Sequence, residues 1–144
     1  MHITRETDYA VRCVLYLSKN PDSVSDVNDI SEAMGIPKTF VAKILQRLAK
    51  AGIARSTRGV KGGFKIAGNP SQLSLLHVIE AVQGPLSINL CVINEKSCVR
   101  SEYCSVHPAW IEIQHAIEKR LKQYTFGRLA REDSAREKEK KSGP

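Results

Sequence analysis

Apolar residues recur every three or four positions in five segments of the chain, which predicts an amphipathic helix in each. These segments are residues 4–18, 27–34, 37–51, 74–82 and 108–124. Glycine or proline follows each of the first four, and both residue types end helices. A further short helix is expected near residues 125–130. The pattern predicts a mainly helical protein.

The second and third helices are separated only by the tripeptide Gly35-Ile36-Pro37. Two short helices joined by a tight turn with glycine are typical of a helix-turn-helix. Two short strands, residues 53–56 and 64–67, follow, and the glycines between them permit a tight hairpin. A hairpin after a helix-turn-helix is a wing. The expected fold class is therefore mainly α with a small β-wing, a winged helix-turn-helix followed by a long C-terminal dimerisation helix.

The chain divides into four predicted parts. Residues 1–85 form the winged helix-turn-helix, 86–107 a cysteine-rich loop, 108–130 the dimerisation helix with a short terminal helix, and 131–144 a charged disordered tail. The long helix carries one apolar stripe, which is a reasonable homodimer seam because a two-fold dimer matches a palindromic DNA site. The stripe consists of Trp110, Ile113, Ile117, Leu121 and Tyr124.

Charge is distributed unevenly along the 144 residues, which carry a net charge of +7. Residues 33–79 contain no Asp or Glu and eight Lys or Arg. Such a stretch favours an anionic partner, and double-stranded DNA is the obvious one because cations displace counterions from its phosphates. A solvated basic face without a partner is the alternative. No apolar run approaches the roughly 20 residues of a membrane span, and no secretory segment opens the chain, so a cytoplasmic protein is expected.

The helix-turn-helix and the wing identify the candidate DNA-binding residues. In a helix-turn-helix the first turns of the second helix enter the major groove. The side chains there that lie off the apolar stripe are Lys38, Thr39, Phe40 and Lys43. Basic side chains at a wing tip are placed to reach a minor groove. The predicted tip residues are Arg58, Gly59, Lys61, Gly62 and Gly63.

Three of the four cysteines lie close together in residues 90–108, as Cys91, Cys98 and Cys104, and His107 follows. Thiolates are soft ligands, so this loop is a candidate metal or cluster site. The gaps of six and five residues are loose for zinc, whose cysteines usually come in close pairs, and suit a bulkier iron–sulfur cluster better. Disulfides fit a cytosolic chain poorly. Unligated thiols are the remaining alternative, and Cys13 is expected to be a buried hydrophobe.

The chain resembles the iron–sulfur winged-helix transcription regulators of the IscR, NsrR and RirA type. The resemblance runs from Met1 to about Ala130 and rests on several motifs together. They are MHIT with DYAV, ISEAMGIPKTFVAKILQRLAKAGI, RGVKGGF, HVIEAVQGPL, the three loop cysteines and YTFGRLA.

The resemblance implies a homodimer in which Cys91, Cys98 and Cys104 hold an iron–sulfur cluster that controls DNA binding. Two residues compete as fourth ligand. His107 resembles the histidine of the assembly regulator, whereas Asp8 resembles the aspartate that the nitric-oxide sensor contributes from the partner subunit. His107 is favoured because it is local in sequence and imidazole binds iron. The interval between Cys91 and Cys98 is one residue longer than is usual in these relatives, so both a 2Fe–2S and a 4Fe–4S cluster stay as alternatives.

The predicted function is that of a dimeric DNA-binding regulator, with a repressor favoured, whose binding to a palindromic operator responds to iron, redox state or nitric oxide through the cluster. The alternative keeps the DNA-binding dimer and uses the cysteines as a zinc site or thiol switch. An enzyme is not expected, because the sequence contains no nucleophile–base pair or Gly-rich cofactor motif and an enzyme would leave the basic segment unexplained.

Overall fold

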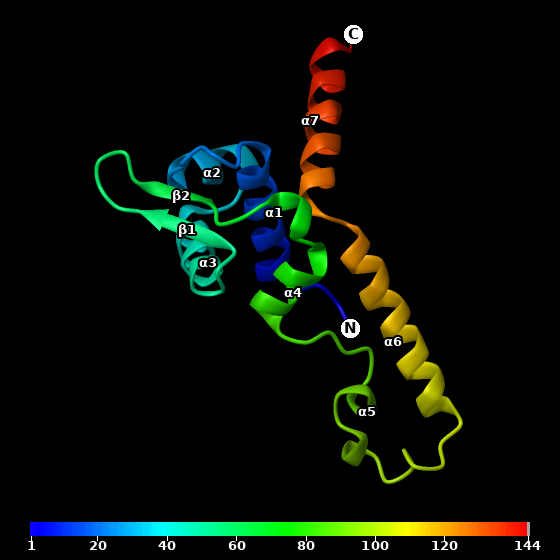
Figure 1. Cartoon of the computed structure of the whole chain (residues 1–144). Helices are drawn as coiled ribbons and strands as arrows, with labels where there is room; N and C mark the ends of the chain where they lie inside the picture. Colours follow the sequence, from blue (N-terminus) through cyan, green and yellow to red (C-terminus); the bar gives the residue numbers. More distant parts are fainter. Residues whose placement is uncertain (144) are drawn as a thin grey trace.

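Helices dominate the computed structural model, which describes residues 1–143 (Figure 1). Its elements in chain order are α1 (Arg5–Lys19), α2 (Val27–Met34), α3 (Lys38–Lys50), β1 (Ala54–Thr57), β2 (Gly63–Ile66), the 3-10 helix η1 (Pro70–Gln72), α4 (Leu75–Gln83), α5 (Leu90–Ile93), the 3-10 helix η2 (Glu95–Ser97), α6 (Val106–Gln123) and α7 (Phe126–Ser142). The two strands pair antiparallel, with Ala54 opposite Ile66. The predicted fold class is confirmed.

Helix α1 lies at the centre of the molecule and packs against α2, α3, α4 and α7. Its apolar stripe is almost completely removed from water, as expected for a helix with neighbours on several sides. The α1 side chains in the main core are Ala10, Cys13, Val14 and Leu17. The main core is completed by buried side chains of α2, α3, α4 and α7 and of the wing base. The helix-turn-helix and the wing are thereby held on one rigid body.

The long helix begins earlier than the sequence pattern predicts. The prediction started it at Pro108, but α6 begins at Val106, so His107 lies within its first turn. Proline is tolerated here because the N–H groups of a helix's first turn have no partner within the helix. The candidate ligand His107 is therefore fixed on a helix rather than carried by the loop.

The predicted disordered tail at residues 131–144 is wrong for residues 131–142, which extend α7 to Ser142. Pro144 lies outside the described residues. The charges that favoured disorder instead form ion pairs that stabilise the helix. Lys19 of α1 contacts both Asp133 and Glu137, the latter at 2.7 Å, and Arg128 pairs with Glu132 one turn on at 2.9 Å.

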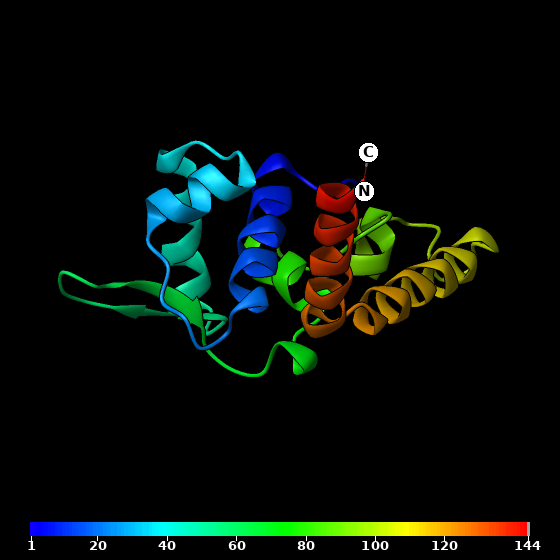
Figure 2. The same cartoon turned by 90° about the horizontal axis from the view of Figure 1, so that it is seen from above.

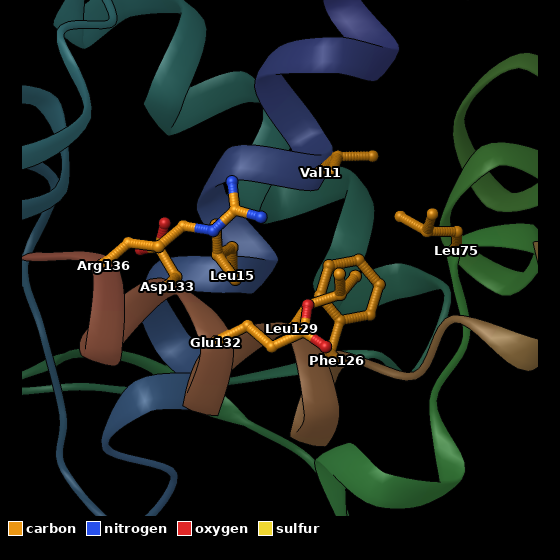
Figure 3. Close-up of a pocket in the computed structure, with 8 residues that line it drawn as sticks. All are labelled: Val11, Leu15, Leu75, Phe126, Leu129, Glu132, Asp133 and Arg136. Carbon is orange, nitrogen blue, oxygen red and sulfur yellow. The ribbon is translucent and has the colours of Figure 1, made fainter.

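Apolar side chains at the start of α7 explain how this helix is anchored. Phe126 is fully buried in the main core. Beside it lies a cavity of about 300 Å³, in which side chains of α1, α4 and α7 meet (Figure 3). Its lining residues are Val11, Leu15, Leu75, Phe126, Leu129, Glu132, Asp133 and Arg136. The charged members belong to α7, so the contact is apolar on the α1 and α4 sides.

The apolar stripe predicted along α6 has a packed part and an exposed part. Ile117 and Leu121 pack against a small second core made by Leu76, Ile79 and Leu86, and so join α6 to α4. Nearer the start of the helix, Trp110 and Ile113 remain exposed. Only that first half is free to contact another molecule. Within residues 1–143, no helix combines the length and apolar character needed to cross a bilayer.

Candidate nucleic-acid interface and cysteine pocket

The helix-turn-helix is built by local signals in α2 and α3. Asp26 and Asp29 form a capping box that starts α2. Gly35 ends it with a φ of 64°, in the left-handed region that glycine adopts at low cost. Ser31 then donates a hydrogen bond of 2.5 Å to the carbonyl oxygen of Ile36, which closes the turn. The turn orients α3 with its apolar side on α1.

The N-terminus of α3 is open to solvent. Pro37 stands at the N-cap position, where it provides no side-chain hydrogen bond to the first turn. Free N–H groups at a helix start bind phosphate oxygens well. The predicted contact residues surround this end, and all of them are exposed. They are Lys38, Thr39, Phe40 and Lys43.

Contacts with α1 distinguish some α3 side chains from the others. The Phe40 ring packs edge-on against Tyr9 at 5.7 Å between ring centroids, which restricts its motion. Arg47 donates a 2.8 Å hydrogen bond to Glu6 and is thus already paired. By contrast, Lys38 and Lys43 have no carboxylate partner among the ion pairs of residues 1–143. Among these residues Lys50 is also unpaired but lies at the C-terminal end of α3, so Lys38 and Lys43 are the unpaired cations nearest the open N-terminus of the helix.

The wing is attached through Phe64, one residue pair from the tip-side end of its strands, and is free beyond that point. Ser25 and Phe64 exchange two backbone hydrogen bonds, of 2.9 and 2.8 Å, so the segment before α2 adds a bridge beside β2. Gly63 permits this approach, because a Cβ there would lie 2.4 Å from the Ser25 carbonyl oxygen. At the tip Gly59 adopts a φ of 109°. Arg58 and Lys61 beside it are exposed.

The predicted cluster ligands converge on one cavity at the other end of the molecule, far from the wing (Figures 1 and 2). This cavity, here named the cysteine pocket, has a volume of about 250 Å³ and lies between α5, η2 and the first turn of α6. Its lining residues are Asn89, Leu90, Cys91, Ser97, Cys98, Ser101, Cys104, His107 and Trp110. All four predicted local ligands are among them. Asp8 lies elsewhere, on α1, and pairs with Arg12 at 2.8 Å.

The side chains of the cysteine pocket differ in burial and hydrogen bonding. Cys91 and His107 are buried, Cys104 is half-buried and Cys98 is exposed. Hydrogen bonds from the backbone N–H groups of Val106 and His107, assisted by the charge of Arg100, lower the pKa of Cys104. The Nδ1 atom of His107 is buried without a hydrogen-bond partner. A buried polar atom usually has a partner, so this nitrogen is free for one.

The donor set of the cysteine pocket fits a soft metal centre or an iron–sulfur cluster by its chemistry. Three thiols that are free of disulfides and one unpartnered imidazole nitrogen supply four ligands. In residues 1–143, however, no three His, Cys, Asp or Glu side chains are already grouped closely enough to hold one metal ion. Binding would therefore require these side chains to move closer together.

Comparison with known proteins supports a regulatory role for this architecture. A family model described as Rrf2, iron-dependent transcriptional regulator, matches residues 3–132. The chain belongs to the Rrf2 family. It is 28% identical over 138 residues to the HTH-type transcriptional regulator IscR of Photobacterium profundum, a match that covers 95% of this chain and 80% of the relative.

Two solved Rrf2-like structures share the fold. CymR, the global cysteine regulator of B. subtilis, superposes with a TM-score of 0.74 at 21% identity over 90% of this chain and 96% of its own. IscR of T. potens superposes with a TM-score of 0.71 at 19% identity over 100% of this chain and 93% of its own. As an Rrf2 protein, the chain is a DNA-binding transcription regulator and not an enzyme.

Sequence reasoning about this Rrf2 chain missed the roles of two residues, one that holds the segment before the cysteine pocket and one at the start of α4. Gln114, on α6, is 2% exposed and hydrogen-bonds to the segment that leads into the cysteine pocket. His77 starts α4, because its Nδ1 atom accepts a 3.0 Å hydrogen bond from the Ser74 N–H and so completes a capping box. The expected signal in a capping box is Glu or Gln. A histidine in that position gives no recognisable pattern.

Cys13 is expected to resist alkylation in the native protein, which separates it chemically from the pocket cysteines. Burial raises the pKa of Cys13 to about 12, so at pH 8 almost none of it is the reactive thiolate. Iodoacetamide at pH 8, read by peptide mass spectrometry, should modify the exposed Cys98 and leave Cys13 unmodified. In denaturant both should react. Modification of native Cys13 at the rate of Cys98 would contradict its place in the core.

Proposed function

We propose that this regulator acts as a homodimeric repressor whose affinity for a palindromic operator is controlled by an iron–sulfur cluster. The ligands in this proposal are Cys91, Cys98, Cys104 and His107, and a bound cluster would supply sensitivity to iron, oxidants or nitric oxide. The contacts to DNA come from α3 through Lys38, Thr39, Phe40 and Lys43, and from the wing through Arg58, Gly59, Lys61, Gly62 and Gly63.

The observation that carries the proposal is the convergence of four donors on the cysteine pocket. These donors come from α5, from the loop after η2 and from the first turn of α6, and the Nδ1 atom of His107 has no other partner. Because this nitrogen is buried, solvent does not supply the missing partner, and a bound group would. His107 is thus favoured as fourth ligand over Asp8, which is engaged with Arg12.

The proposed coupling runs through α6. His107 is fixed on the first turn of this helix, whereas Cys98 is carried by an exposed loop. Closing the loop around ligands on α6 would restrain the start of the helix, and α6 in turn packs on α4 through Ile117 and Leu121. A ligand shifts a conformational equilibrium only as far as it binds one state better than the other. Operator affinity with and without cluster therefore measures the coupling directly.

Cys98→Ala is expected to abolish cluster binding. Wild-type protein purified without oxygen should be coloured, and its iron and sulfide content per chain should distinguish a 2Fe–2S from a 4Fe–4S cluster. The variant should lose most of the visible absorbance because one thiolate ligand is missing. Cys13→Ala is the matched control, since it removes a cysteine outside the cysteine pocket and should keep the spectrum. Visible absorption and iron and sulfide assays provide the measurement.

A colourless, iron-free wild type would overturn the cluster and favour the second candidate, a zinc site or thiol switch. The exposure of Cys98 favours this candidate, because an oxidant can reach its sulfur. The fold shared with the cysteine regulator CymR is compatible with it. A zinc site would appear as about one zinc per chain. A thiol switch would appear as reversible loss of operator binding on oxidation.

Ile113→Glu is expected to break the dimer. Val106, Trp110 and Ile113 are 51%, 36% and 45% exposed and recur on one side of α6, and an apolar stripe of this spacing is typical of a helix–helix seam. A carboxylate in the seam would be buried without a partner. Analytical ultracentrifugation should show a shift from twice the chain mass of 16.0 kDa to that mass.

His115→Glu is the control for the dimer experiment. It adds the same carboxylate to an exposed position of α6 that lies off the stripe, so the protein should remain dimeric. A monomeric wild type at micromolar concentration, or a dimer that tolerates Ile113→Glu, would refute the proposed seam.

A further inference from the structure

Gln114 is one of two buried polar side chains on α6, and the other is His107. The two are seven residues apart, about two helical turns, so they lie on the same side of the helix. That side faces α5 and α4, whereas Trp110 and Ile113 of the apolar stripe are exposed. Gln114 therefore stands between the cysteine pocket and the second core.

The carboxamide of Gln114 is fully engaged with the segment between α4 and α5. Its Oε1 atom accepts a 3.0 Å hydrogen bond from the N–H of Ile88, and its Nε2 atom donates one of 2.7 Å to the carbonyl oxygen of Leu86. Nε2 also donates a 2.8 Å hydrogen bond to Glu118, one turn along α6. One side chain thus satisfies two backbone groups of a segment that has no sheet or helix partner of its own.

The position of these hydrogen bonds matters because residues 86–88 connect the second core to the cysteine pocket. The Leu86 side chain is buried in the second core with Ile79 of α4 and Leu121 of α6. Three residues after Ile88 the chain reaches Cys91 in the cysteine pocket. Gln114 holds this segment on α6. The segment and the cysteine pocket therefore move together only if α6 moves with them.

We propose that Gln114 is a positioning residue that fastens the start of the cysteine loop to α6, so that the cysteine pocket, α6 and α4 change position together. The second half of this inference rests on the proposed function, because it links the pocket to operator binding. The first half, the attachment of residues 86–88, does not depend on any bound group. Helix α4 also packs on α1 and α3, which gives the pocket a route to the recognition helix.

Gln114→Leu tests both halves, because leucine has a similar size and neither donates nor accepts. In metal-free protein the hydrogen–deuterium exchange of the Ile88 amide, whose N–H donates to Gln114, should rise on the order of tenfold. In cluster-loaded protein the ratio of operator affinities with and without cluster should fall toward one. Gln123→Leu is the matched control, since it makes the same change at the exposed end of α6, where Gln123 contacts only Arg120. Circular dichroism establishes that both variants are folded.

The outcomes separate this inference from the function on which it rests. Unchanged exchange of the Ile88 amide in Gln114→Leu would overturn the attachment. Increased exchange with an unchanged affinity ratio would overturn the coupling and leave Gln114 a purely structural residue. A wild type without iron would defeat the cluster, and the exchange measurement on metal-free protein would still decide the attachment.

Discussion

Phe126→Ala is expected to lower the free energy of unfolding by about 3–5 kcal/mol, the usual range for removing a fully buried phenyl ring. Phe126 is 0% exposed, and its N–H donates a 2.8 Å hydrogen bond to the carbonyl oxygen of Leu73. Removing the phenyl ring would enlarge the cavity of about 300 Å³ already present beside it. The side chains around Phe126 would therefore lose contacts on two sides. Urea unfolding followed by circular dichroism, at one fixed protein concentration, measures the change.

Phe40→Ala is the matched control for this prediction. It removes the same ring from a site that is 46% exposed, where the main loss is the edge-on contact with Tyr9, and should cost about 1 kcal/mol. If Phe126→Ala were no more destabilising than Phe40→Ala, α7 would not be docked on the core as described.

The double substitution Arg58→Ala with Lys61→Ala is expected to weaken operator binding by on the order of 100-fold or more at physiological salt. Both side chains are exposed at the wing tip. A dimer would lose four cations, and each phosphate contact contributes about 0.9 to the slope of log affinity against log salt concentration. The slope should therefore fall by about 3 to 4. Fluorescence anisotropy titrations at several salt concentrations measure it.

Lys140→Ala with Lys141→Ala provides the control, since it removes the same charge from the exposed end of α7, away from the wing (Figure 1). This variant should bind within about twofold of wild type. Equal losses in the two double variants would mean that net charge, and not the wing, supplies the affinity.

Local signals explain why most of the fold could be predicted from the sequence. Helices α1 to α4 have apolar residues at helical spacing and end at Gly or Pro, and the predicted limits of α2 agree with the structure at both ends. The wing could be predicted because glycines mark its tip. The convergence of Cys91, Cys98, Cys104 and His107 was also predictable, because all four lie within one short loop and the helix turn beside it. Their role as ligands stays a prediction.

Contacts between distant segments explain what could not be predicted. Helix α7 is held partly by Lys19, more than 100 residues away, which contacts Asp133 and Glu137. From the sequence alone these carboxylates belong to a charged run that is typical of disorder. Gln114 has the same difficulty, because its partners are backbone atoms 26 and 28 residues earlier. A glutamine on a helix gives no sign of such partners until the fold is known.

The attachment of the wing at Ser25 and Phe64 has a consequence for how related regulators can diverge. The hairpin is held against the segment before α2 at Phe64, whereas residues 58–62 at the tip touch no other element through backbone hydrogen bonds. The tip can therefore change in length and sequence while the recognition helix keeps its position. In the proposed mode of DNA binding, preferences for the two grooves are thus free to evolve separately within a single small domain.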